Sequence, residues 1–157
     1  MGTKHKDAKN KKTNHRGHRE HRERATRKTT HQLGAYEKDW LTHDVIGAAI
    51  EVHKELGPGL LERIYENALC IELTKRNIRY TQQQQIAAKY KDQIVGDLIV
   101  DLLVEGKGVV EPKSVKELTS IHEAQLIAYL KLAKIKTGLL INFNGLTLKK
   151  GIRRISV

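Results

Sequence analysis

DLIVDLLVEGKGVVEPK, residues 97–113, is the stretch of sequence that decides the fold. It lies within two apolar runs, Gln93 to Val104 and Val109 to Val115, which are separated by a short turn containing two glycines. Runs of this composition on either side of a glycine-containing turn predict two strands joined as a hairpin. Acids interrupt both runs, Asp97 and Asp101 in the first and Glu111 in the second, and Asp101 and Glu111 are each flanked by apolar residues. The hairpin is therefore expected to carry two carboxylates inside apolar strands.

Helices and further strands are predicted on both sides of this hairpin. Apolar residues at helical spacing predict one helix that starts near Asp39 and ends at Gly57-Pro58, and a second from about Leu60 to Arg76. We expect Ser120 to cap a third helix, with Glu123 completing a capping box. This third helix is expected to end at about Leu132. The other expected elements are a polar strand over Ile78–Tyr90, a strand over Thr137–Phe143 and a last strand over Leu148–Val157. This order favours an α/β architecture with a mixed central sheet flanked by helices.

The N-terminal part of the chain differs sharply in composition from the rest. Between Met1 and Leu33 there are 11 Lys or Arg residues and three acids, so this stretch carries +8 of the net charge of +11. It has almost no apolar side chain to bury, which predicts a disordered basic leader over residues 1–38, followed by one domain over residues 39–157. Such a charge attracts nucleic acid non-specifically. A metal-binding role for its histidines is disfavoured because nothing would preorganise them.

The composition also indicates the cellular compartment in which the protein acts. The single cysteine, Cys70, excludes a disulfide framework within the chain and fits a reducing environment. No apolar run approaches the length of a membrane span, and the N-terminus lacks the hydrophobic centre of a secretory signal. The leader is rich in arginine, but Leu33 is its only sizeable apolar side chain, so it cannot form an amphipathic transit peptide. We therefore expect a cytoplasmic protein.

The acids of the hairpin point to a metal site. Side chains alternate across a strand, so Glu111 and Lys113 share a face about 6.5 Å apart, and the hairpin brings Asp101 beside them. Carboxylates in apolar strands are costly unless they are paired or metal-bound, and oxygen-only ligands favour Mg²⁺ or Mn²⁺. Lys113 would then stabilise the negative charge of a phosphoryl transition state. A buried ion pair of Lys113 with one of these acids, without a metal, remains the alternative.

Asp101, then nine intervening residues, then Glu111-Pro112-Lys113, resembles the metal-binding signature of the PD-(D/E)XK nuclease superfamily. Residues 59–65, GLLERIY, match the GxxExxY pattern that names one prokaryotic branch of that superfamily. The similarity is carried in order and spacing by four segments, IGAAIEVHKELGPGLLERIYENAL, DLLVEGKGVVEPKSV, IHEAQLIAYLKL and GLLINFN.

The resemblance implies a restriction-endonuclease-like core and a Mg²⁺-dependent (or Mn²⁺-dependent) nuclease whose partner is DNA or RNA. It implies roles for six residues: Asp101 and Glu111 as metal ligands, Glu62 as an additional acid at the metal and the catalytic centre, Lys113 as the catalytic lysine, and Gln125 and Tyr129 as a helical Q-x-x-x-Y motif of exonuclease-like members. His122 would lie on the face of that motif, although ordinary helix packing explains it equally well. Glu62 has an alternative interpretation as part of a solvated acidic helix face.

One position departs from the family pattern. Pro112 stands where the family usually has an apolar strand-forming residue, and proline lacks the N–H that a central strand uses. The alternative function is therefore a catalytically weakened module that binds nucleic acid or a protein partner without cleaving. The last strand, Leu148–Val157, would be an edge available for pairing in a homo-oligomer. Neither the choice of DNA or RNA nor the mode of cleavage follows from the sequence.

Overall fold

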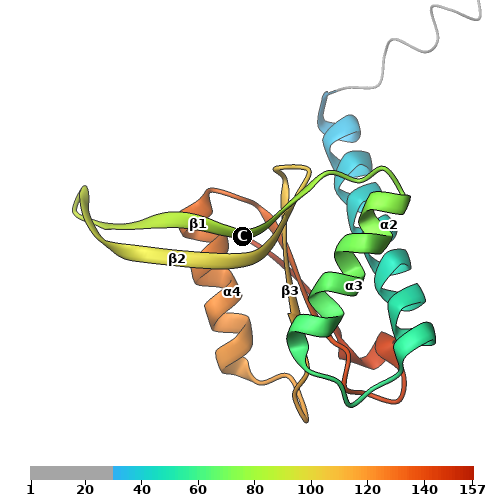
Figure 1. Ribbon diagram of the computed structural model, residues 1–157. Coiled ribbons are helices and arrows are strands. Elements are labelled where there is room, and N and C mark those ends of the chain that lie inside the picture. Colours follow the sequence, from blue (N-terminus) through green and yellow to red (C-terminus); the bar gives the residue numbers. More distant parts are fainter. Residues whose placement is uncertain (1–29) are drawn as a thin grey trace, which may run out of the picture. The chain divides into compact units, whose positions relative to one another are not determined.

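The computed structural model describes the backbone of residues 30–157 and the side chains of residues 41–157 (Figure 1). The chain divides into two compact units, residues 1–36 and 37–157. The division falls inside α2 (Thr30–Leu56). The other elements belong to the second unit: α3 (Glu62–Lys75), β1 (Tyr80–Tyr90), β2 (Gln93–Val104), β3 (Gly108–Lys113), α4 (Ser120–Ala133), β4 (Thr137–Asn142), the 3₁₀ helix η1 (Leu148–Gly151) and β5 (Ile152–Ser156).

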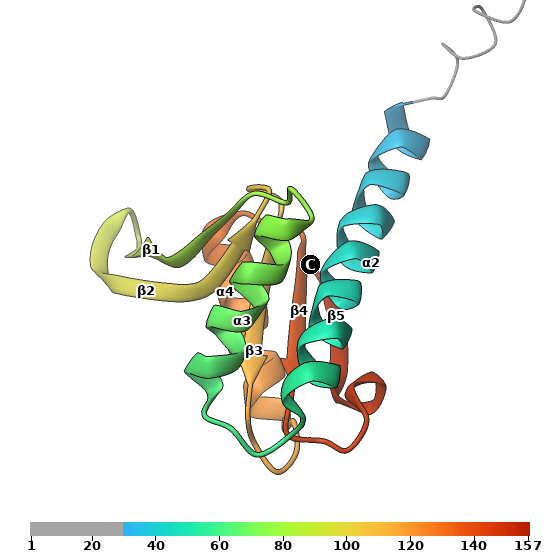
Figure 2. The ribbon, with the colours of Figure 1, turned by 45° about the vertical axis from the view of Figure 1, so that its right-hand side comes forward.

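The strands form a mixed five-stranded sheet in the order β1-β2-β3-β4-β5. Neighbouring strands are antiparallel except β3 and β4, which run parallel and are connected through α4. Helices α2 and α3 pack side by side on one face of the sheet, and α4 packs on the other (Figure 2). The α/β fold with a mixed, helix-flanked sheet, predicted from the order of the elements, is confirmed, and β5 lies at an edge of the sheet as expected.

The larger core lies between the sheet and helices α2 and α3, and it fixes the start of α3. Tyr65 is fully buried, and its ring stacks on that of Phe143 with 4.7 Å between centroids. Its hydroxyl donates to the carbonyl of Gly57 at 2.6 Å and accepts from the N–H of Leu60 at 3.1 Å. These bonds hold the loop between the two helices, so the first turn of α3, which carries Glu62, has a defined position over the sheet.

The smaller core lies between α4 and the opposite face of the sheet. Leu126 and Leu130 of α4 pack there against Val109 and Leu140 of the two parallel strands. The approach is close at Gly138, where an added Cβ would lie 2.9 Å from Cδ1 of Leu126. Because a side chain at position 138 would collide with α4, glycine there lets the helix lie near the strands.

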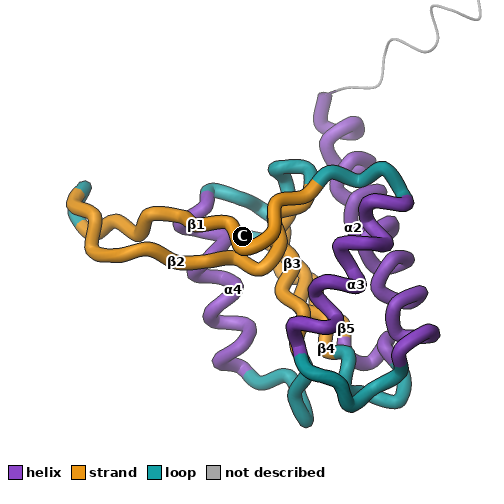
Figure 3. The backbone as a smooth tube through the Cα atoms, viewed as in Figure 1, coloured by secondary structure: helices purple, strands orange, loops and turns teal. Residues whose placement is uncertain are grey.

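The β1–β2 hairpin extends well beyond the rest of the sheet (Figure 3). Strands β1 and β2 pair from Tyr80↔Val104 out to Tyr90↔Gln93, whereas β2 pairs with β3 only from Leu102↔Val110 to Val104↔Gly108. Beyond Leu102, toward the tip of the hairpin, β2 therefore no longer pairs with β3. The acids of the two strands lie at this point of separation.

Three predictions about element ends need correction. Helix α2 begins at Thr30 rather than near Asp39, because no proline between these two positions interrupts the helix. Helix α4 is capped by Thr119, whose capping-box partner is His122 rather than Glu123. The first residues of the predicted last strand form η1, and only Ile152–Ser156 is strand. Most of the predicted leader, residues 1–29, lies outside the described part of the chain, so its disorder and the 38/39 boundary remain predictions.

Candidate metal and active site

Asp101 and Glu111 face each other where β2 leaves β3. The last regular pair is Leu102↔Val110, and one step further the main-chain N–H of Asp101 donates to Oε1 of Glu111 at 3.3 Å. Glu111 is 4% exposed, and the side chain of Asp101 is 19% exposed. The predicted juxtaposition of the two carboxylates follows from the hairpin register, because a strand pair in register sets opposite residues side by side.

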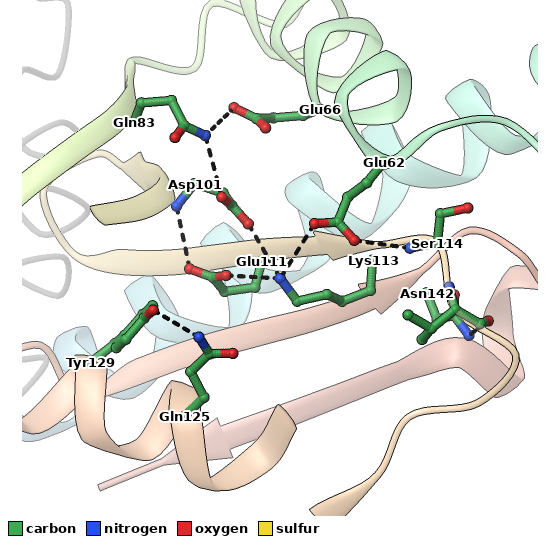
Figure 4. A network of polar contacts seen from close by, with 11 residues as sticks. Glu62, Glu66, Gln83, Asp101, Glu111, Lys113, Ser114, Gln125, Tyr129 and Asn142 are labelled. Carbon is green, nitrogen blue, oxygen red and sulfur yellow. Dashed lines mark hydrogen bonds and ion pairs between the residues drawn. The ribbon is translucent and has the colours of Figure 1, made fainter. Parts of the chain in front are cut away.

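Lys113 lies among three carboxylates that come from three elements (Figure 4). Its Nζ is 3.2 Å from Oε2 of Glu111, 3.5 Å from Oδ2 of Asp101 and 3.6 Å from Oε1 of Glu62. The side chain of Lys113 is only 13% exposed, so these ion pairs are partly shielded from water. The structure therefore gathers four of the six predicted site residues into one cluster.

Glu62 contacts this cluster from α3, although its side chain is 43% exposed. It stands in the first turn of α3, and its Oε2 accepts a hydrogen bond from the N–H of Ser114 at 3.2 Å. The hydroxyl of Ser114 donates to the carbonyl of Leu60 at 2.6 Å, which ties the end of β3 to the start of α3. These two contacts aim Glu62 at the lysine.

Burial and crowding of like charges alter the protonation of the cluster. Burial, and next the neighbouring Asp101, raise the pKa of Glu111 from its usual 4.5 to about 8, while Lys113 opposes this rise. Burial by itself would lower the pKa of Lys113, but Glu111, Asp101 and Glu62 raise it overall. The pKa of Glu111 thus rises first because of burial and next because of Asp101, whereas the pKa of Lys113 rises because three carboxylates surround Nζ. The cluster therefore favours an added positive charge.

The donor set fits a hard divalent cation. Oδ2 of Asp101 is buried, has no hydrogen-bond partner within the described residues, and faces Nζ of Lys113. A buried carboxylate oxygen without a hydrogen bond is costly, and a cation that binds only oxygen would satisfy it. In the described part of the chain no group of three or more His, Cys, Asp or Glu side chains stands ready for a metal, and Nζ of Lys113 lies between the carboxylates of Asp101 and Glu111.

Pro112 lies in β3 just beyond the last residue that pairs with β2. Strand residues direct their main-chain groups alternately to one neighbour and the other. The carbonyl of Lys113 accepts from Phe143 just beyond β4, so the main chain of Pro112 faces the side of β2, which has already separated. The parallel register continues through Pro112↔Ile141 to Lys113↔Asn142. Pairing with β2 ends before Pro112, the parallel pairing with β4 continues through it, and Glu111 and Lys113 keep a common face.

Gln125 and Tyr129 meet each other one turn apart on α4. Nε2 of Gln125 donates to the Tyr129 hydroxyl at 2.8 Å (Figure 4). This bond is internal to the pair, and no hydrogen bond among residues 41–157 joins either side chain to the carboxylate cluster. Nδ1 of His122 accepts from the N–H of Thr119 at 3.0 Å, which gives this histidine a role in the helix cap.

Two polar residues beside the cluster are not predicted by the sequence. Gln83 of β1 donates through Nε2 to Oδ1 of Asp101 at 3.2 Å and to Oε1 of Glu66 at 2.8 Å. Glu66 is buried on α3, one turn after Glu62. The run Gln82–Gln85 is typical of an exposed strand face, and nothing in its composition distinguishes Gln83 from its neighbours.

A family model described as the PD-(D/E)XK nuclease superfamily matches residues 39–155. The match spans the sheet, the helices over it and the carboxylate cluster. This chain therefore belongs to the PD-(D/E)XK nuclease superfamily. Comparison with curated proteins and with solved structures found no match. Within the described residues no helix is both long enough and apolar enough to cross a membrane.

Proposed function

We propose that this protein is a Mg²⁺-dependent nuclease of the GxxExxY branch that hydrolyses phosphodiester bonds of DNA or RNA. The observation that carries the proposal is the convergence of Asp101, Glu111 and Glu62 on Lys113 within a domain of this superfamily. A structural ion pair needs only one acid for one lysine. With three ionised acids and one lysine, this cluster has a net charge of −2. A divalent cation has the charge that is missing.

Each side chain has a role in this proposal. Mg²⁺ or Mn²⁺, held by Asp101 and Glu111, would supply activation of a water molecule and neutralisation of charge on the phosphate. Lys113 would donate its ammonium group to the phosphate oxygens where negative charge develops. Glu62 would be an additional acid at the metal and would hold Lys113 in place through their ion pair.

The Q-x-x-x-Y pair of α4 would act on the substrate. Gln125 and Tyr129 are already joined by a hydrogen bond, so their side chains are preorganised. We expect them to position the scissile strand. The basic leader would add phosphate attraction, because the domain itself carries only about +3 of the net charge of +11. The single buried cysteine fits action in the cytoplasm.

The test is cleavage of labelled single- and double-stranded DNA and RNA by the purified protein in Mg²⁺, Mn²⁺ or EDTA. Asp101→Ala and Lys113→Ala serve as inactive partners, and Lys116→Ala serves as a matched control on an exposed lysine three residues from Lys113. The proposal is supported if cleavage requires the metal, is lost in Asp101→Ala and Lys113→Ala, and is retained in Lys116→Ala. Absence of cleavage above the variants on every substrate would favour the second candidate, a module that binds nucleic acid or a protein partner without cutting.

A further inference from the structure

Gln83 adopts a backbone conformation that is unusual for its place in a strand. Its φ is +53°, in the left-handed region that costs a non-glycine residue about 1–2 kcal/mol. On either side of it β1 pairs regularly with β2, through Gln82↔Leu102 and Gln84↔Val100, but the intervening position opposite Asp101 is absent from the register. The irregularity thus falls on the one residue of β1 that faces the predicted metal ligand.

The left-handed backbone has a clear consequence for the side chains. Nε2 of Gln82 and Nε2 of Gln83 both lie 2.8 Å from the same oxygen, Oε1 of Glu66. Adjacent residues of a regular strand point to opposite faces of the sheet, so two neighbours could not reach one atom. The positive φ of Gln83 turns its amide toward α3. The strained residue is therefore the one that allows this contact.

The amide of Gln83 holds one particular oxygen of Asp101. Its Nε2 donates to Oδ1, and Oδ2 is left without a hydrogen bond and directed at Nζ of Lys113 (Figure 4). Glu66 anchors the other side of the same NH₂ group and is itself held by Gln82, which also donates to Asn67 at 2.9 Å. A chain of hydrogen bonds thus runs from α3 through Gln83 to the carboxylate.

We propose that Gln83 is a positioning residue, which fixes the Asp101 carboxylate so that Oδ2 faces the cation. This inference rests on the proposed metal-dependent function, because it assigns Asp101 to the cation. Groups that hydrogen-bond to a metal ligand commonly alter metal affinity by 10–100-fold when removed. Backbone strain that persists beside a site is expected where it serves that site.

Gln83→Gly separates the two roles of the residue. Glycine accepts a positive φ without strain but has no amide, so the metal-free fold should be retained while Asp101 loses its constraint. Gln85→Gly is the matched control, because Gln85 donates to Asp97 at 2.8 Å across the same two strands without a positive φ. Gln83→Asn tests the amide further, since asparagine tolerates the left-handed region but is shorter by one methylene.

The measurement is Mn²⁺ affinity, followed by the electron paramagnetic resonance signal of free Mn²⁺, with the melting temperature of the metal-free protein alongside. We expect Gln83→Gly to bind Mn²⁺ at least tenfold more weakly, Gln83→Asn to lie between it and the native protein, and Gln85→Gly to bind normally. The metal-free melting temperature of Gln83→Gly should be no lower than that of Gln85→Gly. Equal Mn²⁺ affinity in Gln83→Gly and the native protein, or a melting temperature below that of Gln85→Gly, would overturn the inference. A native protein that binds no Mn²⁺ would contradict the proposed function as well.

Discussion

Replacing Lys113 by methionine should separate metal binding from catalysis. Methionine has a similar length and no charge, so Lys113→Met leaves three carboxylates facing one another within the distances of 3.2–3.6 Å that Nζ now spans. Removing one partner of a buried ion pair costs about 3–5 kcal/mol, and uptake of a proton by Glu111 should keep the loss near the lower value. For a domain of this size that corresponds to a fall of roughly 10 °C in melting temperature.

The same substitution should strengthen metal binding. In the native protein a cation must displace the Lys113 ammonium from the point where the carboxylates converge, and in Lys113→Met that competition is gone. We expect Mn²⁺ affinity to rise about tenfold, equivalent to about 1.4 kcal/mol, so that Mn²⁺ stabilises the variant more than the native protein. Cleavage should nevertheless fall by about 10²–10³-fold, because the charge that stabilises the transition state is lost.

Thermal unfolding with and without Mn²⁺, together with a Mn²⁺ titration and a cleavage assay, measures all three effects. Lys116→Met is the control, because Lys116 is exposed and lies three residues along the chain. A Mn²⁺ affinity that falls in Lys113→Met would refute this reasoning, since it would mean that the lysine supports the metal site rather than occupying its position. Retained cleavage would refute the catalytic role of Lys113.

Three further changes test the site and the core around it. The pKa of Glu111 in the folded protein is raised to about 8, so its contribution to stability is complete below pH 4.5 and is lost as pH rises through about 8. Urea unfolding in EDTA should show this decline in the free energy of unfolding. Glu111→Gln should make the free energy of unfolding less dependent on pH. An equal slope in that variant would contradict the assignment. Gly138→Ala should lower the free energy of unfolding by about 1–3 kcal/mol through its collision with Leu126, and adding Leu126→Val should restore part of the loss; additive losses would exclude that collision. Pro112→Leu should change stability by less than about 1.5 kcal/mol and cleavage by less than about tenfold, so cleavage found only in Pro112→Leu would show that the proline disables the site.

The central hairpin is predictable because its signals are local. Apolar strands on either side of a glycine turn fix the register, and the register alone sets Asp101 opposite Glu111. Strand β4, Thr137–Asn142, is also recognisable in the sequence, because all six of its residues are buried and the four from Gly138 to Ile141 are apolar or glycine. Dense apolar runs bounded by turn residues indicate strands by themselves, which is why the amino-acid sequence is enough to locate the sheet and its acids.

The ends of elements are harder to predict because neighbouring residues compete for the same role. Thr119 and Ser120 are both good N-cap residues, and the choice depends on which backbone N–H groups the loop leaves free. The structure selects Thr119, with His122 accepting from its N–H. Histidine is not part of the usual capping pattern, so that pattern favours Ser120 and Glu123 instead.

The surroundings of Asp101 do not follow from the sequence. Gln83 is one of four consecutive glutamines, and its positive φ is found together with contacts to Glu66 and Asp101, which are distant in the sequence. The effect of Pro112 is likewise hidden from local patterns, since it depends on where β2 separates from β3. Both features arise from tertiary structure, where local propensities no longer decide.

Cleavage by Asp101→Cys in different metals tests most directly whether this carboxylate binds the cation on which the chemistry depends. Sulfur ligands disfavour Mg²⁺ and bind softer metals, so the ligand exchange should change which metal supports the reaction. We predict that Asp101→Cys loses cleavage in Mg²⁺ and regains it in Mn²⁺ or Cd²⁺, measured against the native protein in the same metals. Full cleavage by Asp101→Cys in Mg²⁺, or cleavage by the native protein in EDTA, would contradict a metal-dependent nuclease centred on Asp101.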